Sequence, residues 1–154
     1  MIALLKTARG KEHIELLDRP VPELQDAEVL IRVKYAGICG TDLKIYQDQA
    51  PCEIPVILGH EFSGEIARLG SGVLHWSVGD PVVAQTAQII CGHCSYCRTG
   101  RELMCADRQS IGYGVDGAFA EYIKVNERLL HRIPDGLSME TAALAEPLAL
   151  RYMH

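Results

Sequence analysis

The sequence has no excess of basic residues. Its 15 lysines and arginines are outnumbered by 20 aspartates and glutamates, which gives a formal net charge of −5 at pH 7. Proteins that bind nucleic acids or anionic membranes need a basic surface, so we expect neither kind of partner. No apolar run approaches the ~20 residues of a transmembrane helix either.

The sequence also lacks the opening of a secretory signal peptide. The segment Met1–Lys6 has too short an apolar stretch and no basic residues before it. We therefore expect a cytoplasmic protein. In that reducing compartment the six cysteines are better candidates for metal ligands or nucleophiles than for disulfides.

Internal repeats, low-complexity tracts and flexible linkers are missing as well. The length of 154 residues is that of a typical domain. The proportions of 48% hydrophobic and 23% charged residues are those of an ordinary globular protein. We expect one domain spanning residues 1–154.

Alternation of apolar and polar residues is the main structural signal. In Glu28–Ala36 the alternate residues Val29, Ile31, Val33 and Tyr35 share one face. The polar residues Glu28, Arg32 and Lys34 are expected on the other face, which predicts a half-buried strand. Shorter strands are expected at Ile2–Leu5, Ile14–Leu17, Glu61–Leu69, Pro81–Ala84 and Phe119–Val125. Many short strands separated by Gly and Pro turns favour a mainly β barrel or sandwich.

Helix signals are few. A short helix is expected to open at Thr41 and Asp42. Ser138 is a candidate N-cap for an alanine-rich helix that runs to Glu146, and Pro147 is expected to kink or stop it.

Four cysteines lie in the pattern C-x2-C-x2-C-x7-C, at Cys91, Cys94, Cys97 and Cys105. Four thiolates within 15 residues can hold one zinc ion tetrahedrally, and such a closed site is structural. Four unrelated core cysteines would have less polar neighbours. The bacterial iron–sulfur signature has three residues and a proline around its last cysteine, unlike the seven here. The spacing therefore predicts a structural zinc lobe over residues 91–105.

A second set of candidate ligands is dispersed along the chain. Cys39 follows the clearest strand, and His60 and Glu61 are adjacent. One thiolate, one imidazole and one carboxylate can hold zinc and leave a fourth position for substrate, as catalytic zinc sites do. Taken alone, Cys39 would be interpreted as a core cysteine, and His60 beside Glu61 as an exposed polar pair.

The surrounding motifs resemble those of the zinc-dependent medium-chain alcohol dehydrogenase family. They follow the family's order across nearly the whole chain. In chain order they are Cys39-Gly-Thr-Asp42, Gly59-His60-Glu61-x-x-Gly64-x5-Gly70-x2-Val73, Gly79-Asp80-Pro81-Val82, the four-cysteine loop, Asp116-Gly117-Ala118-Phe119-Ala120-Glu121-Tyr122 and Glu146-Pro147-Leu148.

This resemblance implies a GroES-like, partly open β-barrel with a few short helices and two zinc ions. By motif position, the catalytic zinc ligands would be Cys39, His60 and Glu61, joined by Glu146 as in sorbitol or polyol dehydrogenases. Thr41 would relay the substrate proton. Asp42 would orient the ligating histidine.

One departure from the family pattern is Lys44. It occupies a place where threonine dehydrogenases and some polyol dehydrogenases have a histidine.

The segment Gly112–Gly117 reads G-x-G-x-x-G, the dinucleotide-binding fingerprint. That fingerprint requires a strand before it and a helix after it. Here a polar stretch precedes it and a strand-like stretch follows, so we interpret it as a hairpin turn. A nucleotide-binding domain is therefore expected to be absent from this chain.

The sequence thus predicts the catalytic-domain portion of a polyol- or threonine-type dehydrogenase, inactive by itself. NAD or NADP would act only in a full-length parent enzyme, on a small alcohol or polyol. Self-association into a homo-oligomer stays open. Two alternatives also stay open: a non-catalytic zinc-binding scaffold or interaction module, and a zinc hydrolase with Glu61 or Glu146 as general base.

Overall fold

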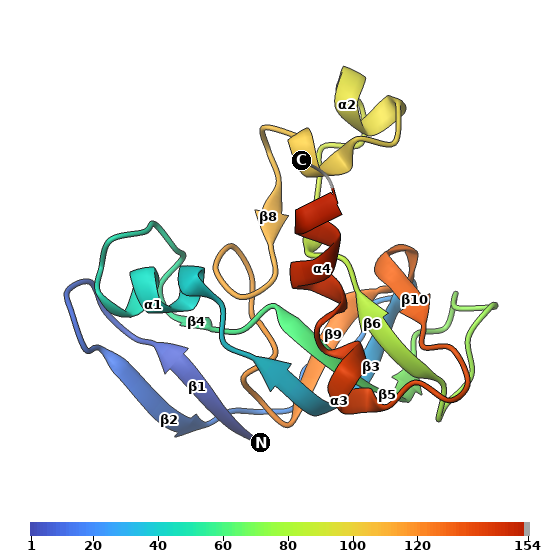
Figure 1. The fold of residues 1–154 in the computed structure, drawn as a ribbon, viewed down its shortest axis with the longest axis horizontal. Coiled ribbons are helices and arrows are strands. Elements are labelled where there is room, and N and C mark those ends of the chain that lie inside the picture. The colour runs from blue at the N-terminus through green and yellow to red at the C-terminus, as the bar shows by residue number, and fades with distance from the viewer. Residues whose placement is uncertain (153–154) are drawn as a thin grey trace.

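The computed structural model describes residues 1–152 and is built mainly from short strands, with a few short helices (Figure 1). Met153 and His154, at the end of the expected domain, lie outside the described residues. The strands are β1 Ile2–Lys6, β2 Ile14–Asp18, β3 Glu28–Gly37, β4 Val56–Ile57, β5 Glu61–Leu69, β6 Pro81–Ala84, β7 Ala87–Ile89, β8 Gln109–Ser110, β9 Tyr122–Asn126 and β10 Leu130–Arg132. The helices are α1 Gly40–Tyr46, α2 Ser95–Arg98, α3 Met139–Ala142 and α4 Ala145–Tyr152, with 3-10 turns η1 Glu102–Met104 and η2 Glu127–Leu129.

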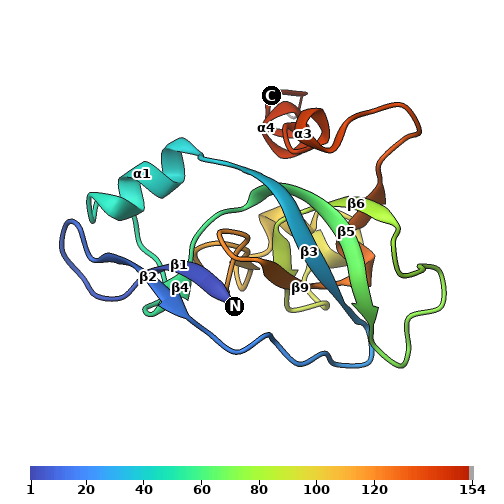
Figure 2. The same ribbon diagram turned by 90° about the horizontal axis from the view of Figure 1, so that it is seen from below.

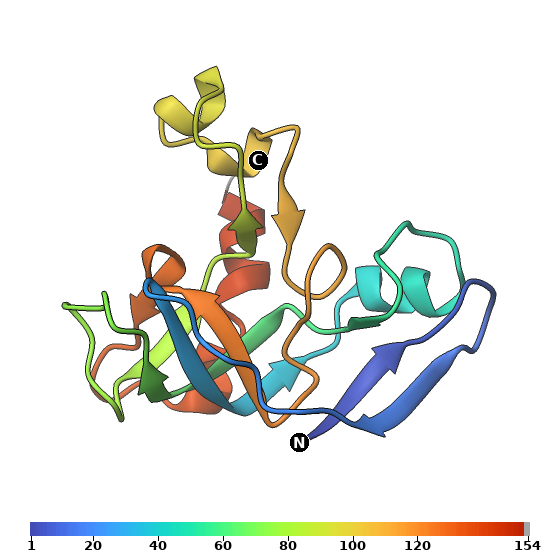
Figure 3. The ribbon, with the colours of Figure 1, turned by 180° about the vertical axis from the view of Figure 1, so that it is seen from behind.

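The strands form three antiparallel sheets. The largest has the order β10-β6-β5-β3-β9, the second has the order β2-β1-β4, and β7 pairs with β8. The main core lies against the five-stranded sheet and includes Val29, Ile31, Ile66, Val82, Ile123 and Val125. Figure 3 shows β9 crossing beside β3 at the back of the molecule. The expectation of a mainly β fold is confirmed.

The strand expected over Glu28–Ala36 is β3, but its two ends differ from the prediction. Glu28 was expected on the polar face and is buried, and its carboxylate accepts hydrogen bonds from the Gln25 N–H and the Lys124 ammonium. Tyr35 was expected on the buried face and is 46% exposed. The pairing of β3 with β5 shifts register between Val33 and Tyr35, and this irregularity ends the regular alternation of faces.

Four of the strands were not predicted. They are β4, β7, β8 and β10, each of two or three residues. A segment this short shows no readable alternation, so only pairing in the folded protein identifies it.

The predicted helix after Ser138 forms, but it breaks sooner than expected. The Ser138 hydroxyl accepts the Thr141 N–H at 3.1 Å and caps α3. A second helix, α4, starts at Ala145, so Pro147 lies in its first turn and does not stop it. The first four N–H groups of a helix have no partner within that helix, and proline costs little there.

The glycine-rich segment Gly112–Gly117 is a turn, as predicted, although the strands around it belong to different sheets and form no hairpin. The Gly112 N–H donates to the Val115 carbonyl at 2.9 Å. A Cβ on Gly117 would lie 2.2 Å from the carbonyl oxygen of Gly59. These glycines therefore permit close contact with the segment before His60, and the next regular element is the strand β9.

The cysteine-rich residues 91–105 project from the barrel on a stem formed by β7 and β8 (Figures 1 and 3). None of the residues of α2 or η1 is buried. Arg128 connects the barrel to this lobe, because its guanidinium donates to the Ala87 and Gln88 carbonyls and to the Glu102 carboxylate. Among the described residues, no helix is long and apolar enough to cross a membrane.

Candidate metal centres

The pairing of two strands brings Cys39, His60 and Glu61 together. Gly37 at the end of β3 lies opposite Glu61 at the start of β5. Cys39 follows two residues later as the N-cap of α1, and His60 precedes the strand. Residues about 20 positions apart in the chain therefore meet where β3 ends and β5 begins, inside the five-stranded sheet. In Figure 2, α1 continues outward from the end of β3, whereas α3 and α4 lie over β3 and β5.

The potential ligand atoms of these three residues all lie within 4.8 Å of one another. His60 and Glu61 are buried, at 5% and 8% exposure, and Cys39 is half-buried. The buried Nδ1 of His60 has no hydrogen-bond partner among the described residues. A thiolate, an imidazole and a carboxylate are ligands that zinc accepts, so the three side chains fit a zinc ion with one position left open.

Gly37 makes room for the Glu61 carboxylate. A Cβ built on Gly37 would lie 2.5 Å from Glu61 Oε2. A side chain at this position would therefore displace the carboxylate. No sequence signal marks Gly37 as part of the site, because its close approach to Glu61 depends on the pairing between β3 and β5.

Asp42 holds two of the three ligand-bearing segments in place. Its Oδ2 accepts the Cys39 N–H at 2.9 Å, and its Oδ1 accepts the Gly59 N–H at 3.3 Å. The same Oδ1 lies 3.8 Å from His60 Nδ1. The buried carboxylate thus fixes the backbone before His60 and faces its ring, the arrangement of an orienting residue next to a metal ligand.

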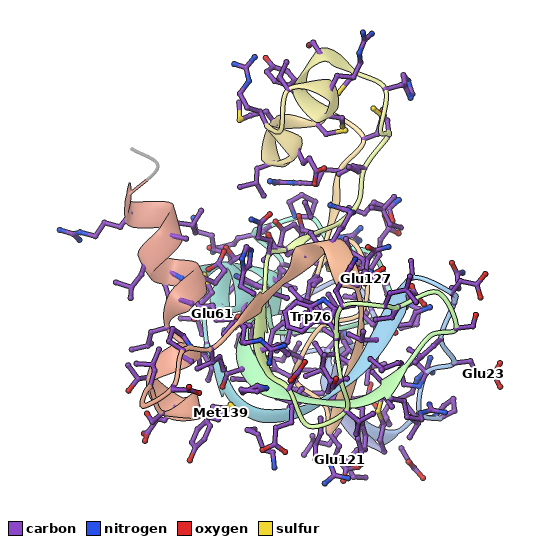
Figure 4. All side chains as sticks on the ribbon, turned by 90° about the vertical axis from the view of Figure 1, so that its right-hand side faces the viewer. Glu23, Glu61, Trp76, Glu121, Glu127 and Met139 are labelled. Atoms are coloured by element: carbon purple, nitrogen blue, oxygen red, sulfur yellow. The ribbon has the colours of Figure 1, made fainter. Side chains whose placement is uncertain are left out.

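Glu146 reaches the same region from the first turn of α4, which contacts β5. In Figure 4, Glu61 lies where these C-terminal helices face the sheet. Burial raises the pKa of the Glu146 carboxyl, the nearby His60 lowers it, and Glu61 raises it. Its buried Oε2 has no hydrogen-bond partner in residues 1–152, and its carboxylate lies outside the set of converging ligand atoms.

Thr41 and Lys44 are both on α1. The Thr41 hydroxyl oxygen lies 3.7 Å from the Cys39 sulfur, and the residue is half-buried. Lys44 is exposed and belongs to the last turn of the helix.

The sulfur atoms of Cys91, Cys94, Cys97 and Cys105 converge inside the projecting lobe, all within 4.8 Å of one another. The sulfur atoms of Cys91 and Cys97 are 3.9 Å apart, and those of Cys94 and Cys97 are 3.5 Å apart. A tetrahedron with Zn–S bonds of ~2.3 Å has sulfur–sulfur edges of about 3.8 Å. The lobe thus has the size and donor set of a closed zinc site.

The electrostatics of this lobe also favour a cation. The backbone N–H groups of His93 and Cys94 lower the pKa of the Cys91 thiol to about 6. Burial and the neighbouring thiols raise the pKa of Cys97 to about 12. Four close thiolates repel one another, so a bound cation is needed for all four to be ionised.

Comparison with known proteins shows to which family the chain belongs. Residues 25–135 match the family model of the alcohol dehydrogenase GroES-like domain. The chain is 44% identical over 149 residues to a sorbitol dehydrogenase from Halalkalibacterium halodurans, covering 97% of the chain and 43% of that protein. It is 38% identical over 151 residues to an L-threonine 3-dehydrogenase from Rhizobium etli, covering 96% of the chain and 44% of that protein.

The fold is likewise similar to that of solved dehydrogenases. An alcohol dehydrogenase from Escherichia coli CFT073, complexed with the cofactor NADH, superposes with a TM-score of 0.89 at 32% identity. The superposition covers 99% of this chain and 44% of that one. The chain therefore spans less than half the length of these relatives.

Proposed function

The chain belongs to the alcohol dehydrogenase GroES-like domain family, and from this premise we propose that it is the zinc-binding catalytic domain of a polyol- or threonine-type dehydrogenase. Its fold is the GroES-like fold of zinc-dependent medium-chain dehydrogenases. The proposed reaction is the oxidation of a secondary alcohol to a ketone, with hydride transfer to NAD or NADP.

The observation that carries the proposal is the convergence of Cys39, His60 and Glu61, with ligand atoms within 4.8 Å of one another. Three ligands leave a coordination position for a substrate oxygen, whereas the four thiolates of the lobe leave none. The first site is therefore proposed as catalytic and the lobe as structural. Glu146 is proposed as a carboxylate near the metal, available as a further ligand.

Each residue around the site has a distinct role in this proposal. A bound zinc ion supplies Lewis-acid polarisation of the substrate hydroxyl and lowers its pKa. The Thr41 hydroxyl, 3.7 Å from the Cys39 sulfur, takes up the substrate proton and passes it towards the surface. Asp42 keeps His60 and the Cys39 backbone in position through the contacts described above.

The hydride acceptor would be bound outside residues 1–152. The relative from Escherichia coli CFT073 is complexed with NADH, and this chain matches 44% of it. Within the described residues, the one segment with a dinucleotide-type glycine pattern packs against Gly59. NAD or NADP is thus assigned to a nucleotide-binding domain of the full-length enzyme.

Metal analysis is the first test of the proposal. After dialysis against a weak chelator, we expect up to two zinc equivalents per chain, one of which is absent in Cys39→Ser. A zinc-free protein, or iron with visible absorbance, would contradict the assignment.

Cobalt substitution tests the proposed substrate class. In the cobalt-loaded chain, addition of sorbitol or threonine should change the visible bands of the Cys39 site, because the alcohol oxygen enters the open position. Cys39→Ser should show no change. A non-catalytic scaffold would give cobalt bands that do not respond to any alcohol, and a hydrolase would instead cleave an activated ester in a zinc-dependent way.

A further inference from the structure

The glycine-rich segment places an aromatic ring against the candidate ligand His60. The rings of Tyr113 and His60 have centroids 5.9 Å apart and planes at 84°, an edge-to-face contact. Aromatic pairs prefer this arrangement at centroid separations of roughly 4.5–7 Å. Tyr113 belongs to the G-x-G-x-x-G pattern. Because this pattern does not bind a dinucleotide in our interpretation, its role is still unassigned.

The position of Tyr113 is firmly determined by its surroundings. Its carbonyl accepts the Glu53 N–H at 2.7 Å, and its own N–H donates to the Ser110 carbonyl at 3.4 Å. Its side chain packs against a small buried cluster that includes Ile45 and Leu58.

The glycines on both sides bring this segment close to the chain that carries His60. A Cβ on Gly112 would lie 2.7 Å from the Gly59 carbonyl oxygen, and a Cβ on Gly117 would lie 2.2 Å from it. The Ala118 N–H donates to the same oxygen at 2.9 Å. The segment therefore packs tightly against Gly59, the residue directly before His60.

Two different elements thus contact the His60 ring. Asp42 on α1 faces its Nδ1 at 3.8 Å, while Tyr113 contacts the ring edge-to-face from the glycine-rich turn. The carboxylate alone leaves the ring free to tilt about the line through Nδ1. The edge-to-face contact with the Tyr113 ring restricts that tilt.

We propose that Tyr113 is a positioning residue that holds the His60 imidazole in the orientation needed to bind the catalytic metal. The glycine-rich pattern serves to bring this tyrosine against His60 instead of holding a pyrophosphate. The inference rests on the proposed function only in taking His60 as a metal ligand.

The test compares cobalt binding by four proteins: the wild-type chain, Tyr113→Leu, Tyr113→Phe and Tyr122→Leu. Tyr122 is the matched control. It is also half-buried, but it lies on β9, where its side chain contacts Arg32 of β3. Bands that remain in Cys39→Ser come from the cysteine lobe and are subtracted. The remaining bands report the affinity and the ligand geometry of the His60 site.

We expect Tyr113→Leu to weaken cobalt binding at the His60 site about two- to tenfold, the range of an edge-to-face aromatic contact. Its visible bands should also shift, which a loss of global stability alone would not produce. Tyr113→Phe keeps the ring and should restore both affinity and spectrum, and Tyr122→Leu should resemble the wild type. If Tyr113→Leu does not fold, Tyr113→Met replaces it with a flexible apolar side chain.

Wild-type affinity and spectrum in the leucine or methionine variant would overturn the inference, and so would an equal loss in Tyr113→Phe or in Tyr122→Leu. A failure of the proposed function looks different: the wild-type chain itself would then bind cobalt only in the cysteine lobe.

Discussion

The two candidate metal centres differ in how far apart their ligands lie in the chain. The lobe takes all four thiolates from residues 91–105, and the helical turns between them bury none of their side chains. The other centre takes Cys39, His60 and Glu61 from the ends of β3 and β5, two neighbouring interior strands of the five-stranded sheet. The helical turns of the lobe therefore add no buried side chains around its ligands, whereas the strands of the other site pack on a hydrophobic core.

This difference implies opposite relations between metal and fold. In the lobe, ordering the chain depends on the ion, because few apolar contacts can offset the lost conformational entropy. In the dispersed site, strand pairing and the contacts of Asp42 position the ligands in advance. The first centre is expected to need its metal in order to fold, and the second to need the fold in order to bind metal.

The largest expected effect is that of Cys105→Ser. Binding of structural zinc is worth ~10–16 kcal/mol in small metallo-peptides, and three thiolates form a poor tetrahedron. The variant should show a lower melting temperature and rapid proteolysis within residues 91–105. Cys39→Ser is the matched control: it should lose one zinc equivalent with only a small change in melting temperature. The opposite pattern would mean that the two roles are reversed.

A smaller, purely local effect is expected from Gly37→Ala. Its new Cβ would meet the flexible end of Glu61, 2.5 Å away, so the fold should persist while the carboxylate moves. We expect zinc affinity at the dispersed site to fall roughly 10–100-fold, as for other changes that disturb metal ligands. Gly40→Ala, where the added Cβ meets nothing within 4 Å, is the control. Equal zinc affinity in both variants would argue against Glu61 as a ligand.

Arg128→Ala tests how the lobe is attached to the barrel. Its guanidinium donates to the Ala87 and Gln88 carbonyls and to Glu102. Loss of these partly exposed bonds should cost about 1–2 kcal/mol, and amide hydrogen exchange in the stem and lobe should accelerate. Zinc content should stay the same, because no ligand changes. Arg98→Ala, at an exposed position within the lobe, should have no such effect on exchange in the stem.

No effect at all is expected from adding NAD to this chain. The segment Gly112–Gly117 packs against Gly59 and leads into a strand, whereas a pyrophosphate requires a helix N-terminus. Calorimetry should detect no binding in the micromolar range. Binding in that range would contradict our interpretation of the glycine-rich segment.

Much of the fold could be predicted from local patterns. The strand expected over Glu61–Leu69 matches β5 at both ends, and Ser138 caps a helix as expected. Predictions failed where distant contacts override the local pattern. Glu28 is buried because Lys124 from β9 provides a charge partner, and Tyr35 is exposed because the pairing of β3 with β5 shifts register.

The cysteine lobe could be predicted from the spacing of its cysteines without any knowledge of the fold. Its four cysteines are so close in the chain that their spacing alone predicts converging sulfur atoms, and these atoms do lie within 4.8 Å of one another. The motifs around Cys39 and His60 indicated the family, but their spacing could not show that the side chains meet.

The close approach of Cys39, His60 and Glu61 instead depends on contacts between distant segments of the chain. Pairing of Gly37 with Glu61 brings the ends of β3 and β5 together, and Asp42 then links the Cys39 backbone to Gly59. The contact between Tyr113 and His60 joins residues more than 50 positions apart, through glycines whose missing side chains matter only at close approach. Such contacts depend on strand register and packing, and these are properties of the whole folded chain.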